Sequence, residues 1–185
     1  MSRGVTIATA FALVLSICLL GGASPASAKK RGCASTSVVP SAKTLPQAQD
    51  AVLCLINQQR ARRGLRSLRA SAPLTQAAFA HSADMVARQY FAHVSLDGET
   101  VRQRVLRTGY FAGNGGGAVE EALACGWMRL ASPKSLVAML MRSSAHQAIL
   151  LNRSLRDVGI GLVLGGPQNV GSSGGATLTL NLARR

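Results

Sequence analysis

The chain has 185 residues, and its 21 Lys and Arg against 7 Asp and Glu give a formal net charge of +14. Because 48% of the residues are hydrophobic and only 15% are charged, the composition excludes a long disordered polyelectrolyte and predicts one folded domain. Aromatic residues make up 4%, which argues against stacking platforms for single-stranded nucleic acid, so no nucleic-acid partner is expected.

Residues 1–28 have the pattern of a signal peptide. Arg3 precedes an apolar run from Val5 to Leu20, and Ala26-Ser27-Ala28 supplies a cleavage site of small residues. We therefore expect a mature chain that starts at Lys29, has no transmembrane segment and is secreted, extracellular or associated with the cell envelope. An uncleaved N-terminal anchor is the alternative. The oligomeric state is left open.

An irregular arm over 29–46 and a single domain over 47–183 are expected after the signal. Thr44 and Pro46 are start signals for a first helix, whose apolar residues recur at helical spacing. Gly64 is placed where this helix should stop.

Three further amphipathic helices are predicted downstream. Ser71 and Pro73 open a helix that runs to about Gln89, and a shorter helix is expected from about Glu99 to Arg107. Ser132-Pro133 opens the fourth.

Strand signals appear late in the chain. The runs Val158–Leu164 and Thr177–Leu182 are β-branched or alternating and are separated by residues typical of turns, which predicts an antiparallel hairpin with a long loop. The glycine-rich stretch 112–117 is predicted to be a flexible connection that leads into Val119–Ala124. Helices followed by a hairpin favour an α+β sandwich.

Three cysteines follow the signal: Cys33, Cys54 and Cys125. An odd number in an exported chain predicts one disulfide and one free thiol. Cys33 with Cys54 is the preferred pair, because it would tie the arm to the first helix, but the sequence alone leaves the connectivity open.

The arginines form one dense cluster, made of Arg60, Arg62, Arg63, Arg66 and Arg69. Such a surface is expected to attract anionic lipid or cell-wall polymer in a salt-dependent manner. A surface that only keeps the protein in solution is the other interpretation.

The three histidines are the most informative candidates for a site. His81 lies on the apolar stripe of the second helix and is predicted to be a buried structural residue. His93 follows that helix, where a loop can present the ring, and His146 lies in the segment Ser143–Asn152.

Short motifs occur in a fixed order along the chain: Leu55-Ile56-Asn57, Arg60, Gly64-Leu65, Leu68, His81-Ser82-x-Asp84-Met85, Phe91-x-His93, Gly109-Tyr110 and Gly159-Ile160-Gly161. Together they resemble the bacterial branch of the CAP superfamily, the cysteine-rich secretory, antigen 5 and pathogenesis-related-1 proteins with their SCP-like extracellular domain. The resemblance implies an α+β fold, a three-layer α-β-α sandwich with a central antiparallel sheet. It also implies a cleft lined by histidines and acidic residues.

Three positions match the family's cleft residues. The histidine of the F-x-H motif matches His93, the glutamate of G-E-N-[IL]-A matches Glu121, and the histidine of S-P-G-H-R matches His146. This chain departs from the pattern by having Glu120 and Ala122 around the motif glutamate, and it lacks a counterpart of the family's second cleft glutamate. The resemblance therefore indicates a diverged member.

The predicted function is a non-enzymatic module that binds lipid, wall glycan or a divalent metal through His93, Glu121 and His146. His93 and His146 are the candidate ligands for a metal such as zinc, although no local ligand spacing supports one. One alternative is a metal-dependent hydrolase with Glu121 as general base, and another is a basic envelope-binding module. The three side chains could equally form a buried polar network.

Overall fold

Helix α1 (Leu45–Ala61) opens the folded domain, with Pro46 in its first turn as the sequence predicts. The computed structural model describes Met1 and residues 32–113, 116–167 and 174–185. The predicted signal peptide therefore lies outside the described residues, except for Met1. Residues Gly32–Arg185 form one unit by their contacts, and the description below concerns this unit.

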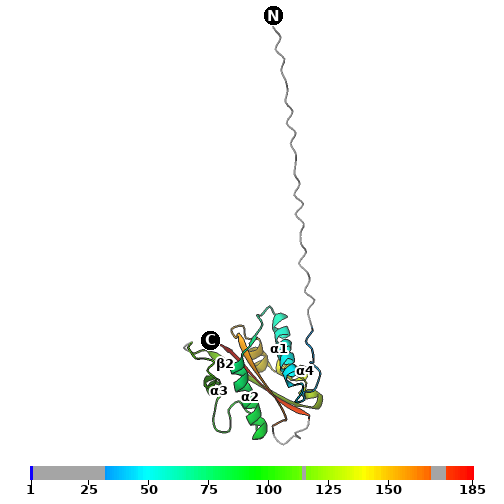
Figure 1. Ribbon diagram of the computed structural model, residues 1–185, viewed down its shortest axis with the longest axis vertical. Helices are drawn as coiled ribbons and strands as arrows, with labels where there is room; N and C mark the ends of the chain where they lie inside the picture. The colour runs from blue at the N-terminus through cyan, green and yellow to red at the C-terminus, as the bar shows by residue number, and fades with distance from the viewer. Residues whose placement is uncertain (2–31, 114–115, 168–173) are drawn as a thin grey trace. The chain divides into compact units, whose positions relative to one another are not determined.

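The other elements follow in chain order: β1 (Arg69–Ala70), α2 (Ala72–Ala87), α3 (Val101–Arg107), β2 (Ala118–Trp127), the 3₁₀ helix η1 (Met128–Ala131), α4 (Pro133–Arg142), α5 (Ser144–Leu150), β3 (Asp157–Leu164) and β4 (Gly175–Arg184). They form a four-stranded sheet in the order β1-β3-β4-β2. Strand β4 is antiparallel to both neighbours, and the two-residue β1 runs parallel to β3. In Figure 1 the sheet is seen between α2 on one side and α1 on the other.

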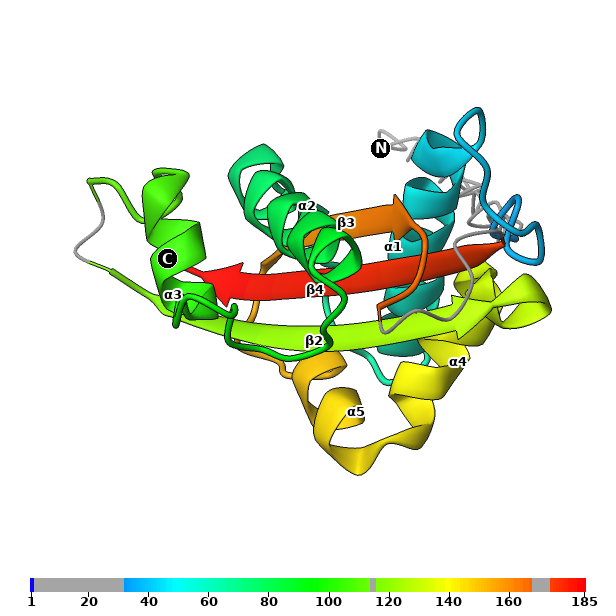
Figure 2. The same ribbon diagram turned by 90° about the horizontal axis from the view of Figure 1, so that it is seen from below.

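Helices cover both faces of the sheet, which gives the expected α-β-α sandwich. Figure 2 shows α2 on one side of β3 and β4, with α4 and α5 on the other. Alternation along β4 assigns its side chains to the two layers, because successive residues of a strand face opposite sides. Leu178, Leu180 and Leu182 belong to the core that includes Ile56 of α1 and Leu136 of α4.

Two glycines bring α2 close to the sheet. A Cβ atom on Gly159 would lie 2.0 Å from the carbonyl carbon of Leu74, and one on Gly161 would lie 2.2 Å from that of Ala78. The backbone of α2 therefore packs directly on β3, and this contact positions the side chains of α2 over β4.

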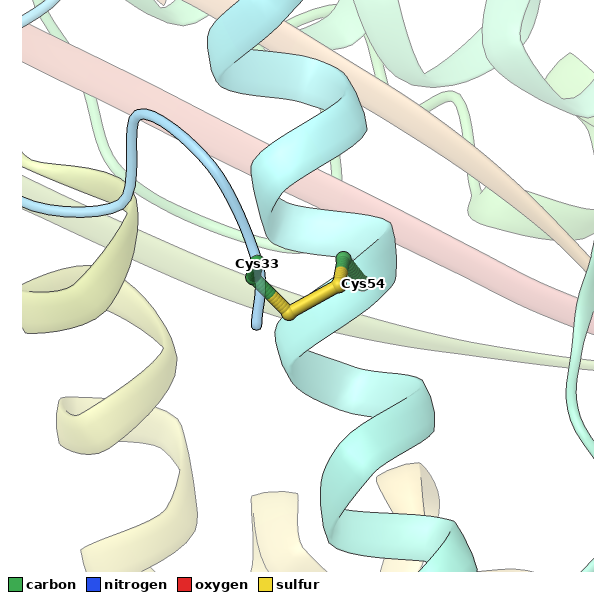
Figure 3. The surroundings of a disulfide bond; sticks show 2 residues. All are labelled: Cys33 and Cys54. Atoms are coloured by element: carbon green, nitrogen blue, oxygen red, sulfur yellow. A yellow bond between two sulfur atoms is a disulfide. The ribbon is translucent and has the colours of Figure 1, made fainter. Parts of the chain in front are cut away.

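The predicted disulfide is present. Figure 3 shows Cys33 of the N-terminal arm bonded to Cys54 of α1, with an S–S distance of 2.01 Å. The arm is also held by the Lys134 N–H, which donates to the Thr36 carbonyl at 2.8 Å. Cys125 is the free thiol, and burial raises its pKa.

Strand β2 differs most from the secondary structure predicted from the residues. The segment Ala118–Trp127 is a ten-residue strand that is paired along its whole length with β4. The sequence patterns predict a glycine-rich connection before this segment but no strand within it. The β3–β4 hairpin is confirmed, with Leu164 opposite Ala176. Residues 114–115 and 168–173 of the two predicted loops lie outside the described residues.

The fourth predicted helix is confirmed as α4, and it is followed by a short helix, α5, that the sequence patterns did not predict. Ser143 has an extended backbone and separates them, and it serves as the N-cap of α5. The break turns α5 away from the axis of α4 and gives His146 an element of its own.

Arg60 corrects the expectation of one continuous basic surface. Its side chain is fully buried and donates to the carbonyls of Arg66 and Leu150, each at 2.8 Å, and of Asn152 at 3.1 Å. It joins the end of α1 to the segment after α5 and is not available to an anion. Arg62 and the other members of the predicted cluster remain exposed.

Among the described residues, no helix combines the length and the apolar character that a membrane crossing requires.

Candidate functional site

Glu121 lies at the centre of the candidate site. It is on β2 opposite Asn181 of β4, and its side chain is 2% exposed. Strand alternation turns it toward α2, whereas its neighbour Glu120 accepts a hydrogen bond from Asn152 Nδ2 at 2.9 Å. The two adjacent glutamates therefore have different environments, and only Glu121 joins the site.

Both oxygens of Glu121 accept hydrogen bonds from the protein. Oε1 accepts from His93 Nδ1 at 2.9 Å, and Oε2 accepts from Arg104 Nη2 at 2.8 Å. With the Asn181 amide oriented so that its nitrogen faces the carboxylate, this nitrogen donates to Oε2 at 3.1 Å and the amide oxygen accepts from Ala78 N at 3.2 Å. The carboxylate is thus a buried, ion-paired group.

His93 lies in the loop between α2 and α3, with 57% of its side chain exposed. A carboxylate only accepts hydrogen bonds, so Nδ1 carries the proton toward Glu121. In the neutral ring, Nε2 then keeps a lone pair on the exposed edge. The contact fixes both the tautomer and the direction of the ring.

Arg104 holds the loop around His93. Its Nη2 donates to the His93 carbonyl at 2.9 Å, and its Nη1 donates to Glu99 O at 2.9 Å and to Ser95 Oγ at 3.2 Å. One buried guanidinium therefore joins the loop backbone to Glu121. Nothing local in the sequence marks Arg104, because an arginine in a short amphipathic helix is ordinarily exposed.

His81 has the structural role predicted for it. Its buried Nε2 forms a hydrogen bond with the Ala92 carbonyl at 2.9 Å, next to His93. Burial lowers the pKa of His81, against the raising effect of Glu121, so the ring is neutral and the 3.9 Å approach of Nε2 to Glu121 Oε1 is not an ion pair. Among the described residues, its Nδ1 and Arg104 Nε are buried without a hydrogen-bond partner.

His146 is on α5, which lies on the other side of the sheet from α2 (Figure 2). Burial lowers the pKa of His146, and repulsion from His93, when that ring is protonated, lowers it further. Two of the three predicted site residues, His93 and Glu121, are in direct contact. The third, His146, is near enough to His93 for its pKa to be affected.

The donor set does not match a complete metal centre. Within the described ranges, no group of three or more His, Cys, Asp and Glu side chains is placed to hold an ion. Catalytic zinc sites use three protein ligands, and the oxygens of Glu121 are already occupied. His93 and His146 are the two imidazoles that remain for a metal.

Comparisons with known proteins agree with the fold. An outer surface protein from Borrelia burgdorferi has a TM-score of 0.62 at 17% identity, with 77% of this chain and 95% of that chain covered. An extracellular protein containing a SCP domain from Bacillus anthracis str. Ames has a TM-score of 0.59 at 21% identity, with 77% of this chain and 44% of that chain covered. These identities support the fold alone.

No curated protein sequence gives a significant match. The model of the cysteine-rich secretory protein family, CAP, matches residues 53–179, which is well over half of the chain and includes His93, Glu121 and His146. The chain therefore belongs to the CAP, or cysteine-rich secretory protein, family.

Proposed function

We propose that this protein is a secreted or envelope-associated CAP domain that binds a wall-glycan ligand at the surface around His93. The observation that carries the proposal is the contact between His93 Nδ1 and Glu121 Oε1, which leaves the Nε2 edge of an oriented ring exposed. The predicted signal peptide and the extracellular or outer-surface descriptions of the two related structures support the location.

The loop around His93 has both kinds of group that a sugar ligand requires. Phe91 is 36% exposed and Val94 is 48% exposed, one on each side of His93 in the sequence. Apolar surface of this kind packs against the C–H face of a sugar ring, while an imidazole nitrogen accepts a hydrogen bond from a hydroxyl group.

Calorimetric titration of residues 29–185 with soluble peptidoglycan fragments tests the proposal. His93→Ala should weaken binding about tenfold or more, because an orienting hydrogen bond and its ring are lost together. Phe91→Ala should also weaken binding, whereas Phe79→Ala removes an exposed aromatic ring of α2 and serves as the matched control. Equal affinity of His93→Ala and the unchanged protein would refute the site.

The hydrolase hypothesis requires a Glu121 carboxylate that can accept a proton from water. The hydrogen bonds to both of its oxygens instead support an orienting role, similar to the carboxylates that hold histidines in place behind a site. Hydrolysis of a wall substrate that disappears on chelation and in Glu121→Gln would restore the enzymatic alternative.

Zinc remains a candidate ligand because two imidazoles are available. We expect no stoichiometric binding at micromolar concentrations, since two neutral nitrogens are fewer than the ligands of stable zinc sites. Micromolar binding that is lost in the double variant His93→Ala with His146→Ala would establish a metal site and contradict this expectation.

A groove between α1 and α4 favours an anionic lipid as a second ligand. The groove has a volume of about 570 Å³. Its lining includes the apolar residues Leu55, Val137 and Met141 and the basic residues Arg62 and Lys134. This combination suits an alkyl chain with an anionic head.

Filling the groove tests the lipid proposal. Ala138 lines it, so Ala138→Phe should abolish binding of a fluorescent fatty acid, while Ala80→Phe on the exposed face of α2 should leave binding unchanged. Unaltered binding in Ala138→Phe would exclude the groove as the lipid site.

A further inference from the structure

A second hollow lies at the end of the sheet where β3 begins and β4 ends. It has a volume of about 480 Å³, and four of its eight lining residues are arginines: Arg69, Arg156, Arg184 and Arg185. Arg69 is in β1, Arg156 directly precedes β3, and Arg184 and Arg185 are at the end of β4, so the strand arrangement brings them together. His93 is not among the lining residues.

The hollow keeps a positive charge after its internal pairing is counted. Its one acidic lining residue is Asp157, whose Oδ1 lies 3.1 Å from Arg69 Nη2. Asp157 Oδ2 accepts from the Tyr110 hydroxyl at 2.7 Å, so both carboxylate oxygens are occupied. Four cations against one anion leave an excess of three. The excess is two if the α-carboxylate of Arg185 is also counted.

Two of the guanidinium groups are held in place without being neutralised. Arg185 stacks on the buried Tyr110 ring at 4.7 Å, and Arg156 Nη1 donates to the backbone carbonyls of Arg153 and Leu155. Carbonyls and an aromatic face orient a cation but carry no full negative charge. These groups therefore remain able to pair with an anion.

The N-terminal end of α2 adds to the positive electrostatic potential of the hollow. Ser71 lines the hollow and is the N-cap of this 16-residue helix, but its side chain makes no capping hydrogen bond. The first turn of α2 contains no acidic residue. The partial positive charge of the helix end is therefore directed at the hollow without an acidic side chain in the first turn of α2 to balance it.

We propose that this hollow binds a water-soluble, phosphate-bearing polyanion. Arginine forks match phosphate oxygens in pairs, and the volume accommodates more than one phosphate group. The absence of large exposed apolar side chains from the lining residues favours a soluble anion over a lipid surface, which would be expected to contact apolar groups as well. This site is separate from the proposed glycan surface at His93.

Calorimetric titration of residues 29–185 with tripolyphosphate at low salt tests the proposal. Replacing Arg184 and Arg185 with Gln should weaken binding about tenfold or more, since charge-assisted hydrogen bonds are lost. The matched control replaces Lys43 and Arg129, two exposed basic residues that line neither this hollow nor the groove between α1 and α4. It removes the same charge and should change the affinity by less than about twofold at moderate salt. Equal losses in the two double variants, or no binding by the unchanged protein, would overturn the proposal.

Asp157→Asn gives a test of opposite sign. It removes the one carboxylate among the lining residues and should tighten tripolyphosphate binding, provided that circular dichroism shows a folded protein. Weaker binding by a folded Asp157→Asn would contradict the charge argument. A parallel arm uses phosphatidylglycerol vesicles. If the Arg184 and Arg185 double variant loses vesicle binding while tripolyphosphate binds neither protein, the ligand is a lipid and the assignment to a soluble anion is wrong.

Discussion

The two faces of strand β4 have opposite chemistry although both are buried. Leu178, Leu180 and Leu182 pack toward α1 and α4, whereas Thr179 and Asn181 face α2. The polar side chains can be buried because they form hydrogen bonds. Thr179 Oγ1 lies 2.7 Å from Ser82 Oγ, and the Asn181 amide donates to the Glu121 carboxylate. The apolar face stabilises the fold through the hydrophobic core, and the polar face positions the charged side chain of Glu121.

The comparison predicts that the charged pair on the polar face is the most sensitive point of the fold. Arg104→Leu leaves the Glu121 carboxylate buried without its cation, so the free energy of unfolding should fall by about 3–5 kcal/mol in chemical denaturation. Arg107→Leu, in the same helix, breaks an ion pair to Glu99 whose arginine is 69% exposed, and should cost about 1 kcal/mol or less. Equal losses would show that burial of the pair has no special role.

On the apolar face, Leu180→Ala should lower the free energy of unfolding by about 2–5 kcal/mol, because it leaves a cavity in a fully buried layer. Its neighbour on the polar face provides the contrast. Thr179→Val removes one hydrogen bond to Ser82, which still donates to the Gly161 carbonyl at 2.8 Å, so the loss should be about 1 kcal/mol. The reverse order in denaturant titration would contradict the proposed division between the faces.

The close contact between α2 and β3 gives a third prediction. Gly161→Ala places a methyl group 2.2 Å from the backbone of Ala78, so α2 must move, at a cost of about 1–3 kcal/mol in unfolding free energy. The movement should also weaken glycan binding at His93. Gly32→Ala meets no atom within 4 Å and is the control for both measurements. Unchanged stability and binding would show that the helix adjusts freely.

The smallest predicted effect is the dependence of folding stability on pH. Burial lowers the pKa of His81 below the ordinary value of 6.5, so in mildly acid solution the unfolded chain binds a proton that the folded chain does not. Stability should therefore fall as the pH decreases below 6.5, until the folded ring also protonates. His81→Gln should reduce this slope by at most about 1.4 kcal/mol per pH unit. His146→Gln should reduce the slope of stability against pH by a separate amount, because the pKa of His146 is lowered as well. An unchanged slope in His81→Gln would mean that folding does not lower the pKa of His81.

Local sequence patterns were sufficient to predict the elements that are marked by a few neighbouring residues. Pro46 and Pro73 mark the starts of α1 and α2, and the alternating runs predict the β3–β4 hairpin. Family motifs identified His93 and Glu121, which are in contact. The disulfide from Cys33 to Cys54 also agrees with its prediction.

Strand β2 shows where local patterns are insufficient. Its residues Val119–Ala124 include two glutamates and two alanines, which are poor strand formers. They form a strand because β4 offers an unpaired edge along its whole length. The conformation of β2 is therefore determined by pairing with a distant segment, and this pairing forms only in the assembled sheet.

The sequence by itself determined the family, the starts of α1, α2, α3 and α4, the late hairpin and the candidate residues, because these depend on short-range periodicity and motifs. Only the tertiary structure decided which charges are buried. Arg60 and Arg104 resemble exposed arginines in the sequence, yet one binds backbone carbonyls and the other binds Glu121. The arginine hollow likewise exists because the sheet brings Arg69 of β1 and Arg184 of β4 to the same hollow. Burial and electrostatic partners are properties of contacts between distant segments, and those contacts form only when the sheet and its two helix layers are assembled.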